Sequence, residues 1–258
     1  MGASDGVPSG GGVAEGGGPP SAPRSEPDTT SGRGDRVREA LSQRLGSLVV
    51  VCETVRRRHN VSAILRSCEA FGLHEVHLVT EGSTAASPGT ARGAERWVHR
   101  RRFDSIEASV ADLKARGFRV VVADLRPGAW SPEEVPVDQP LAIVLGSEFL
   151  GVSARARALA DGAVCIPMQG LTGSLNVSAS AAILVRTLGV RRRAAIAAAG
   201  GRADGADLPQ ALQDAFLGEW AQRGKDAQRG FLARTAPVQA GEPGAEGSDL
   251  PGSGADGG

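Results

Sequence analysis

The chain has 258 residues, with 29 basic and 29 acidic side chains, 36 glycines and three cysteines. No apolar run reaches the ~18 residues that a membrane span requires, and the cysteines form no C-x-x-C pair. These features argue against a membrane protein and a disulfide-stapled secreted domain, and we expect a soluble, cytoplasmic protein without a signal peptide. Cys52, Cys68 and Cys165 each lie in an apolar stretch, as buried free thiols do.

The net charge of zero is unevenly distributed, because both ends of the chain are acidic and the part between them is basic. Residues 1–34 and 236–258 are rich in Gly, Pro and Ser with few large apolar side chains, so we expect both to be disordered tails. The tails hold eight acidic and two basic residues, which leaves 27 basic and 21 acidic residues between them, a net charge near +6. That excess favours a polyanionic partner. The part between the tails is divided into one domain, 35–193, and a linker with a C-terminal helix, 194–235.

Hydrophobic periodicity predicts alternating helices and strands along the chain. In order, the first half is expected to contain a helix over 36–46, a strand over 48–54, a helix over 61–71, strands over 75–80 and 97–103, and a helix over 105–116. The second half follows with strands over 118–125 and 141–146, a helix over 153–160, a strand over 163–168, and helices over 176–193 and 208–232. This order is typical of an α/β domain with a mainly parallel sheet.

Residues 163–185 form the stretch with the clearest pattern of a ligand-binding strand, loop and helix. It is predicted to be a strand buried on both faces, then a loop that Gly170 and Gly173 allow to turn tightly, then a helix that starts near Asn176. Side chains at a helix start can meet a polar ligand. An ordinary β-α turn has the same pattern.

Several common sites are excluded by their missing motifs. The chain has neither G-x-G-x-x-G nor G-x-x-x-x-G-K-[ST], so a standard dinucleotide or P-loop site is not expected. His59, His74, His77 and His99 are scattered without metal-ligand spacing, and we expect no metal site.

Three segments resemble the three motifs of the SpoU branch of the SPOUT RNA 2′-O-ribose methyltransferases. They are residues 60–72 (NVSAILRSCEAFG), 143–153 (IVLGSEFLGVS) and 166–178 (IPMQGLTGSLNVS). Each motif alone is weak, but their order and spacing together fit the family. The loop 93–97 (GAERW) is most similar to the tRNA guanosine-18 enzymes of this branch.

The resemblance implies a trefoil-knotted α/β domain that binds S-adenosyl-L-methionine. The cofactor would contact main-chain groups around Leu125, Gly146, Ile166, Met168 and Leu175. These are residues that ordinary core packing would explain equally well.

The resemblance also implies the catalytic residues Arg66, Asn60, Glu148, Ser174 and Asn176. Arg66 stands between Ile64, Leu65 and Cys68, where an arginine is costly unless it is paired. An outward-facing arginine on an amphipathic helix fits the same pattern equally well. A guanidinium keeps its proton, so we interpret Arg66 as a cation that stabilises the developing alkoxide. Asn60, expected at a helix start, would fix Arg66 or the substrate, and Glu148 would orient Arg66 or an RNA amine. Ser174 and Asn176 would bind ribose or phosphate.

The implied substrate is tRNA, at the D-loop guanosine, and the implied assembly is a homodimer that buries the helix after residue 176. Phosphate contacts are expected from arginines 56–58, 92, 96, 100–102 and 191–193. With few aromatic residues, recognition of RNA shape and backbone is expected rather than base stacking. Ribosomal RNA as substrate, or a non-catalytic RNA-binding protein, remain alternatives.

Overall fold

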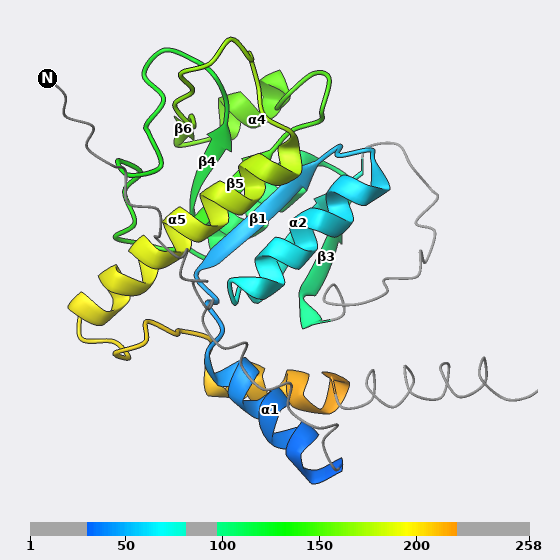
Figure 1. Ribbon diagram of the computed structural model, residues 1–258, viewed down its shortest axis with the longest axis vertical. Helices are drawn as coiled ribbons and strands as arrows, with labels where there is room; N and C mark the ends of the chain where they lie inside the picture. Colours follow the sequence, from blue (N-terminus) through cyan, green and yellow to red (C-terminus); the bar gives the residue numbers. More distant parts are fainter. Residues whose placement is uncertain (1–29, 81–96, 221–258) are drawn as a thin grey trace, which may run out of the picture.

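The computed structural model describes residues 30–80 and 97–220, with side chains from residue 34. The described part contains a six-stranded sheet in the order β3-β2-β1-β5-β4-β6, and every strand pair is parallel. Helices cover both faces of this sheet (Figure 1). The predicted α/β domain with a mainly parallel sheet is therefore confirmed; the trefoil knot stays a prediction.

The strands are short and mostly buried. They are β1 Leu48–Glu53, β2 Glu75–Val79, β3 His99–Phe103, β4 Arg119–Ala123, β5 Leu141–Leu145 and β6 Gly162–Val164. Every residue of β1 and β5 is buried, whereas β3 alternates at one edge of the sheet. The predicted edge strand over 97–103 is confirmed.

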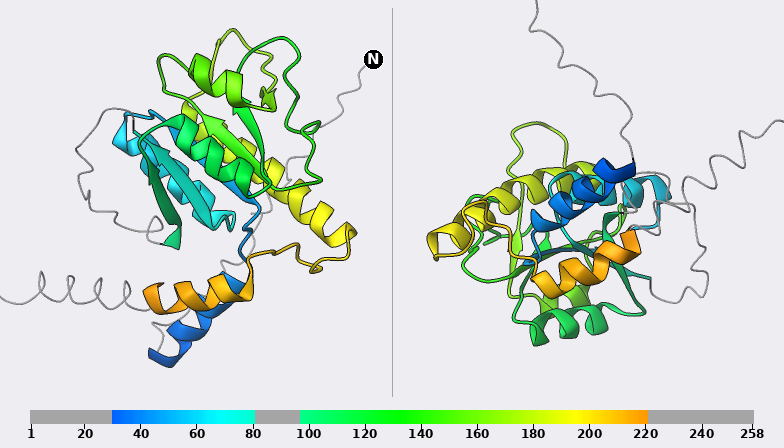
Figure 2. Two further views of the ribbon diagram at one scale, coloured as in Figure 1. Left: turned by 180° about the vertical axis from the view of Figure 1, so that it is seen from behind. Right: turned by 90° about the horizontal axis from the view of Figure 1, so that it is seen from below.

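The helices are α1 Thr30–Ser42, α2 Arg58–Ala70, α3 Ile106–Ala115, α4 Ala154–Leu159 and α5 Val177–Ala198, and residues 210–220 are also helical. α2 and α5 lie against one face of the sheet, and α3 and α4 cover the other (Figures 1 and 2). None of the described helices is long and apolar enough to cross a membrane.

Strand residues alternate between two cores. Val50 and Ile143 point toward α2 and α5, and Val49 and Val144 toward α3 and α4. Burial on both faces is what a parallel sheet with helices on each side requires, and it explains the unbroken apolar runs.

A third, smaller cluster joins the two ends of the described chain. Leu41 of α1 packs with Leu208 and Trp220 of the C-terminal segment, and Figure 2 shows α1 beside the helix 210–220. The Asp207 carboxylate accepts hydrogen bonds from the N–H groups of Gly46 (2.6 Å) and Ser47 (3.2 Å) just before β1. These contacts hold the C-terminal segment against the entry to the central strand.

Several predicted boundaries are wrong. α1 spans Thr30–Ser42 rather than 36–46, so residues 30–34 of the expected disordered tail are helical. β6 ends at Val164 rather than at residue 168. It pairs with β4 on one side and with the single residue Trp130 on the other, and Pro167 has no N–H with which to extend the ladder. α5 continues to Ala198, so the first residues of the expected linker 194–206 are helical. The expected disordered tails fall largely outside the described residues, as do the loop 81–96 and the end of the last helix.

Candidate active site

A pocket of about 600 Å³ opens at the carboxyl ends of β4, β5 and β6. Its walls come from the segments that follow these strands, from the start of α5, and from Arg57 and Asn60 at the start of α2. In open parallel sheets this edge is where ligands bind.

The loop after β5 has a tight fold that depends on glycine. Ser147 and Gly151 exchange two backbone hydrogen bonds of 3.0 Å. A Cβ atom on Gly146 would lie 2.0 Å from the carbonyl carbon of Gly151, so no side chain fits there. Gly151 itself has φ +67°, which glycine adopts without strain. This fold places Glu148 and Phe149 at the pocket.

Asn60 is the centre of the polar contacts at the pocket. Its amide donates a 2.7 Å hydrogen bond to the Glu148 carboxylate, and its carbonyl oxygen accepts one of 3.3 Å from the Asn176 amide. The side chain is buried and belongs to the third residue of α2. Asn60 is not the N-cap of this helix, because α2 begins three residues earlier than predicted and its N-cap is Arg57.

Glu148 is held as a carboxylate by its neighbours. Burial alone favours the protonated form, but hydrogen bonds from Asn60 and from backbone N–H groups outweigh it and lower the pKa of Glu148. One oxygen also accepts the Arg57 N–H at 3.4 Å, and the other has no hydrogen-bond partner in the described part of the chain. Glu148 does not make the expected contact with Arg66 and instead accepts its side-chain hydrogen bond from Asn60.

Asn176 has a structural task as well as its link to Asn60. It is the N-cap of α5, where its oxygen accepts the Ser178 N–H at 2.8 Å, as predicted. Ser174 lines the same pocket. Asn60, Glu148, Ser174 and Asn176, four of the five expected catalytic residues, thus meet at one pocket.

Arg66 does not join them. It is exposed on α2 and is absent from the pocket lining. At 100° per residue it lies about 200° around the helix from Ile64, opposite the buried side that Ile64, Leu65 and Cys68 form. Of the two placements that the pattern allowed, the outward-facing arginine is the one observed, because sequence neighbours on a helix do not share a face.

All five residues expected at the cofactor line the pocket: Leu125, Gly146, Ile166, Met168 and Leu175. Leu125 is 58% and Leu175 is 40% exposed, so neither is a core residue, and ordinary packing does not explain them. An apolar pocket of this volume suits a cofactor held by main-chain groups.

Sequence reasoning missed other residues of the pocket wall. Asp124 and Arg157 face each other there in a two-bond ion pair, with N–O distances of 2.8 and 3.3 Å. Asp124 directly follows β4, a position that signals a site in parallel sheets. Cys165 also lines the pocket and is half-buried, unlike the buried Cys52 and Cys68.

The arginines expected to bind phosphate divide into two groups. Arg56, Arg57, Arg58, Arg100 and Arg102 are exposed, whereas Arg92 and Arg96 lie outside the described residues. Arginines 191–193 instead hold the fold together. Arg191 donates to the carbonyl groups of Pro132 and Val135, and Arg192, which is buried, donates to Ser47. For these three the phosphate prediction is wrong.

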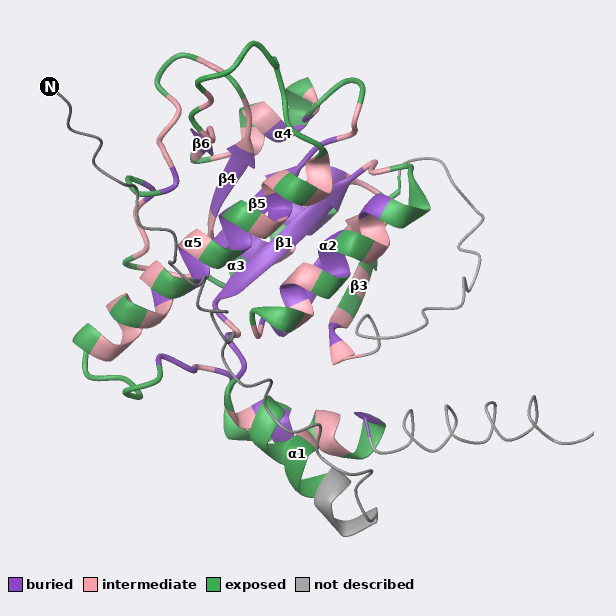
Figure 3. Ribbon diagram, viewed as in Figure 1, coloured by how far each residue is buried: buried purple, intermediate pink, exposed green. Residues whose placement is uncertain are grey.

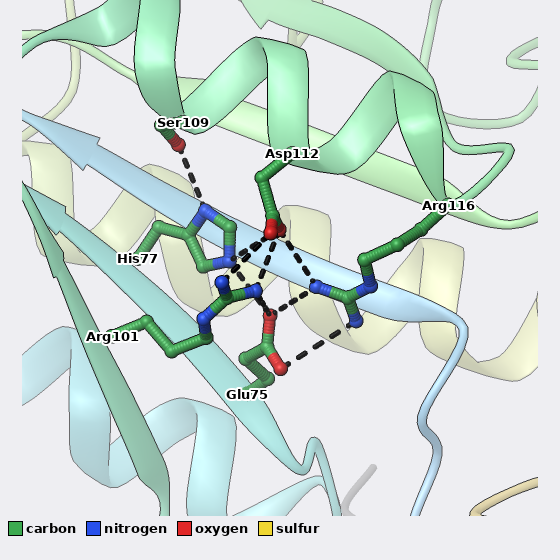
Figure 4. Close-up of polar contacts among 6 residues, drawn as sticks. All are labelled: Glu75, His77, Arg101, Ser109, Asp112 and Arg116. Carbon is green, nitrogen blue, oxygen red and sulfur yellow. Dashed lines mark hydrogen bonds and ion pairs between the residues drawn. The ribbon is translucent and has the colours of Figure 1, made fainter.

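The described part has one group with metal-ligand geometry, formed by Glu75, His77 and Asp112 (Figure 4). Arg116 donates to Glu75 at 2.7 Å, and Arg101 donates to both oxygens of Asp112 at 2.6 and 2.7 Å. His77 bonds Glu75 and Ser109 through its two ring nitrogens. Two guanidinium groups occupy the space that a cation would need, so we read the group as an ion-pair network.

Known proteins share this sequence and fold. The chain matches the model of the SpoU rRNA Methylase family over residues 47–186. The tRNA (guanosine(18)-2′-O)-methyltransferase of Thermus thermophilus is 41% identical over 159 residues, which are 61% of this chain and 82% of that protein.

Solved structures agree with the sequence match. The A. aeolicus TrmH/SpoU tRNA modifying enzyme superposes with a TM-score of 0.65 and 29% identity, over 75% of this chain and 97% of that one. The SpoU methyltransferase AviRb of Streptomyces viridochromogenes, solved in complex with the cofactor AdoMet, has a TM-score of 0.50 and 23% identity over 60% of this chain and 58% of that one. At that identity the likeness concerns the fold.

Proposed function

The chain belongs to the SpoU rRNA Methylase family, and we propose that it transfers a methyl group from S-adenosylmethionine to the ribose 2′-hydroxyl of guanosine 18 in tRNA. The observation that carries the proposal is the meeting of Asn60, Glu148 and Asn176 at the mouth of one pocket. The substrate comes from the relative in Thermus thermophilus, whose name gives both the nucleotide and the hydroxyl.

The pocket fits the cofactor by size and chemistry. Its volume of about 600 Å³ and its wall of Leu125, Ile166, Met168 and Leu175 suit an adenine ring, and peptide groups of the three loops offer donors and acceptors. When bound, S-adenosylmethionine supplies an electrophilic methyl group on a sulfonium. Glu148, kept ionised by Asn60, lines the same pocket.

The side chains around Glu148 give this carboxylate one orientation. Asn60 holds one oxygen, and Asn176 holds Asn60 while it also caps α5. The second oxygen of Glu148 has no partner among the described residues and is available, after a small movement, to a donor on the substrate. We assign Glu148 and Ser174 to the ribose, and Asn60 and Asn176 to the positioning of Glu148.

A homodimer would explain the outer surface of α2 and α5. Ala179, Ile183 and Val190 are exposed on α5, and Ala63 and Arg66 are exposed on α2. Green, exposed residues run along both helices in Figure 3. Small and apolar residues at helical spacing suit a contact with the same face of a second copy.

Arg66 would act from that interface. Because it faces away from its own pocket, a partner subunit is needed to bring it to a reaction site. There the guanidinium would stabilise the alkoxide that forms at the 2′-oxygen, and a substrate phosphate would take the proton.

The proposal is tested by incubating the protein with tritiated S-adenosylmethionine and unmodified transcripts of tRNA and ribosomal RNA. Label in tRNA, recovered as 2′-O-methylguanosine, is the expected result. Label in ribosomal RNA alone would support ribose methylation but would show that ribosomal RNA, not tRNA, is the substrate. Cofactor binding without label in either RNA would contradict the proposal.

A further inference from the structure

Phe149 is an exposed aromatic residue beside the pocket. It follows Glu148 in the tight loop after β5 and lines the pocket, yet 78% of its surface is accessible. Its neighbour Leu150 is 85% exposed and lines the same pocket, so the two side chains form an exposed apolar patch of the kind that marks a binding surface. The place of Phe149 next to the site carboxylate indicates a role toward the substrate.

Arg57 connects Phe149 to the polar site. Its guanidinium carbon lies 5.4 Å from the centre of the Phe149 ring, within the range of a cation–π contact. Its backbone N–H donates to Glu148 at 3.4 Å. Ring, guanidinium and carboxylate therefore lie together at the mouth of one pocket.

The charge around Phe149 favours a nucleic acid over a second protein. Arg56, Arg57 and Arg58 are all exposed, and none has an ion-pair partner within residues 30–80 and 97–220. Phosphate groups supply the missing negative charge. A second copy of this loop would add three more positive charges, which argues against self-association at Phe149.

We infer that Phe149 and Arg57 form a stacking site for the purine base of the nucleotide whose ribose enters the pocket. This inference rests on the proposed function. A ribose reaches the pocket only if its nucleotide leaves the stack of its neighbours, which costs a few kcal/mol. An aromatic ring and a guanidinium plane are the surfaces on which proteins receive such splayed bases. Such stacking departs from the composition, which predicted recognition of RNA shape and backbone rather than base stacking.

The test compares Phe149→Leu, which keeps apolar bulk without a ring, with Phe149→Trp, which keeps the ring. Leu171→Ala, a fully exposed leucine outside the pocket, is the matched control. Phe149→Leu should raise the KM for tRNA about tenfold, the scale of one lost base–aromatic stack. Cofactor affinity, measured by calorimetry, should stay unchanged, and Phe149→Trp and Leu171→Ala should remain within about twofold of wild type.

A second readout is independent of methyl transfer. 2-Aminopurine placed at position 18 of tRNA should be more fluorescent when bound to Phe149→Leu than when bound to the wild-type protein or to Phe149→Trp, because the base that has left its neighbours then has no ring to stack on. This result would support the stacking site even if no methylation were found, so the two proposals can fail separately. Equal fluorescence in the complexes with Phe149→Leu and with the wild type would overturn the inference. So would a dimer that dissociates in Phe149→Leu, since Phe149 would then be a subunit contact.

Discussion

At the scale of single residues, the site depends on a carboxylate that its neighbours keep charged. Glu148 and Asn60 both line the pocket, and burial alone would favour the protonated form of Glu148. The 2.7 Å bond from Asn60 and the backbone N–H groups reverse this preference. The hydrogen bonds from Asn60 and the backbone thus fix the orientation of the Glu148 carboxylate and also keep it ionised.

Glu148→Gln tests the carboxylate. The amide keeps the shape but carries no charge and offers one acceptor oxygen instead of two, so kcat should fall by at least about tenfold, as for other preorganised polar groups. Glu133→Gln, at an exposed glutamate away from the pocket, is the control. Both variants should bind the cofactor within about twofold of wild type. A kcat for Glu148→Gln equal to that of the control would remove the carboxylate from the reaction.

His74 gives the fold a specific sensitivity to acid. Its ring is 3% exposed, packs 4.5 Å from the Phe216 ring, and has no hydrogen-bond partner on either nitrogen in the described part. Burial, followed by the positive charge of His99, lowers the pKa of His74 from 6.5 to about 4. Arg44 and Arg116 act in the same direction, and Glu75 opposes them.

The sign of the pH effect follows from that shift. Between pH 6.5 and 4, His74 is protonated in the unfolded chain but stays neutral in the folded chain. The free energy of unfolding therefore falls as the pH falls through this range. Between pH 7 and 4.5, the free energy of unfolding of His74→Phe should therefore decrease by about 1–3 kcal/mol less than that of the wild type, as measured by urea unfolding. An unchanged slope in His74→Phe would contradict the assignment.

At the scale of helices and strands, most elements could be predicted because one local pattern determines each. β1 and β5 are unbroken apolar runs, and Ser105 and Ser153 cap α3 and α4 through bonds to the third residue along. The bonds that build the site are not local. Asn60 contacts a carboxylate 88 residues away and an amide 116 residues away. Such contacts follow from the strand order, which the sequence pattern does not contain.

α5 carries the prediction that belongs to this scale. Ile183 is 40% exposed on the surface that we assign to the dimer, and a buried carboxylate there would be costly. Ile183→Glu should therefore shift the protein from dimer to monomer in sedimentation velocity. Leu212→Glu alters a leucine of similar exposure, 44%, on the helix 210–220 and should stay dimeric. A wild-type monomer, or a stable Ile183→Glu dimer, would contradict the interface.

At the scale of the whole molecule, the described chain does not bring all five expected catalytic residues together. Four expected residues line the pocket, but Arg66 faces outward with the exposed side of α5. This division was missed in the sequence, where Arg66 appears beside buried residues although the helical period turns it away from them. A dimer that exchanges Arg66 between subunits would complete two sites at once.

Mixed dimers test the exchange. In a dimer of one Arg66→Ala and one Glu148→Gln subunit, one site would have both residues intact and the other would have neither. Random mixing of the two inactive variants should restore about a quarter of wild-type activity, because half the dimers are mixed and half their sites are intact. Activity that stays at the level of the single variants would show that Arg66 acts within its own subunit, or not at all.

The measurement that tests the central proposal most directly is methyl transfer to two tRNAs that differ by one oxygen atom. One is an unmodified transcript, and the other is a ligated tRNA with 2′-deoxyguanosine at position 18. We expect label from tritiated S-adenosylmethionine to enter the first tRNA, at position 18, and not the second, because the second lacks the accepting hydroxyl. Equal label in both tRNAs would contradict ribose methylation at guanosine 18.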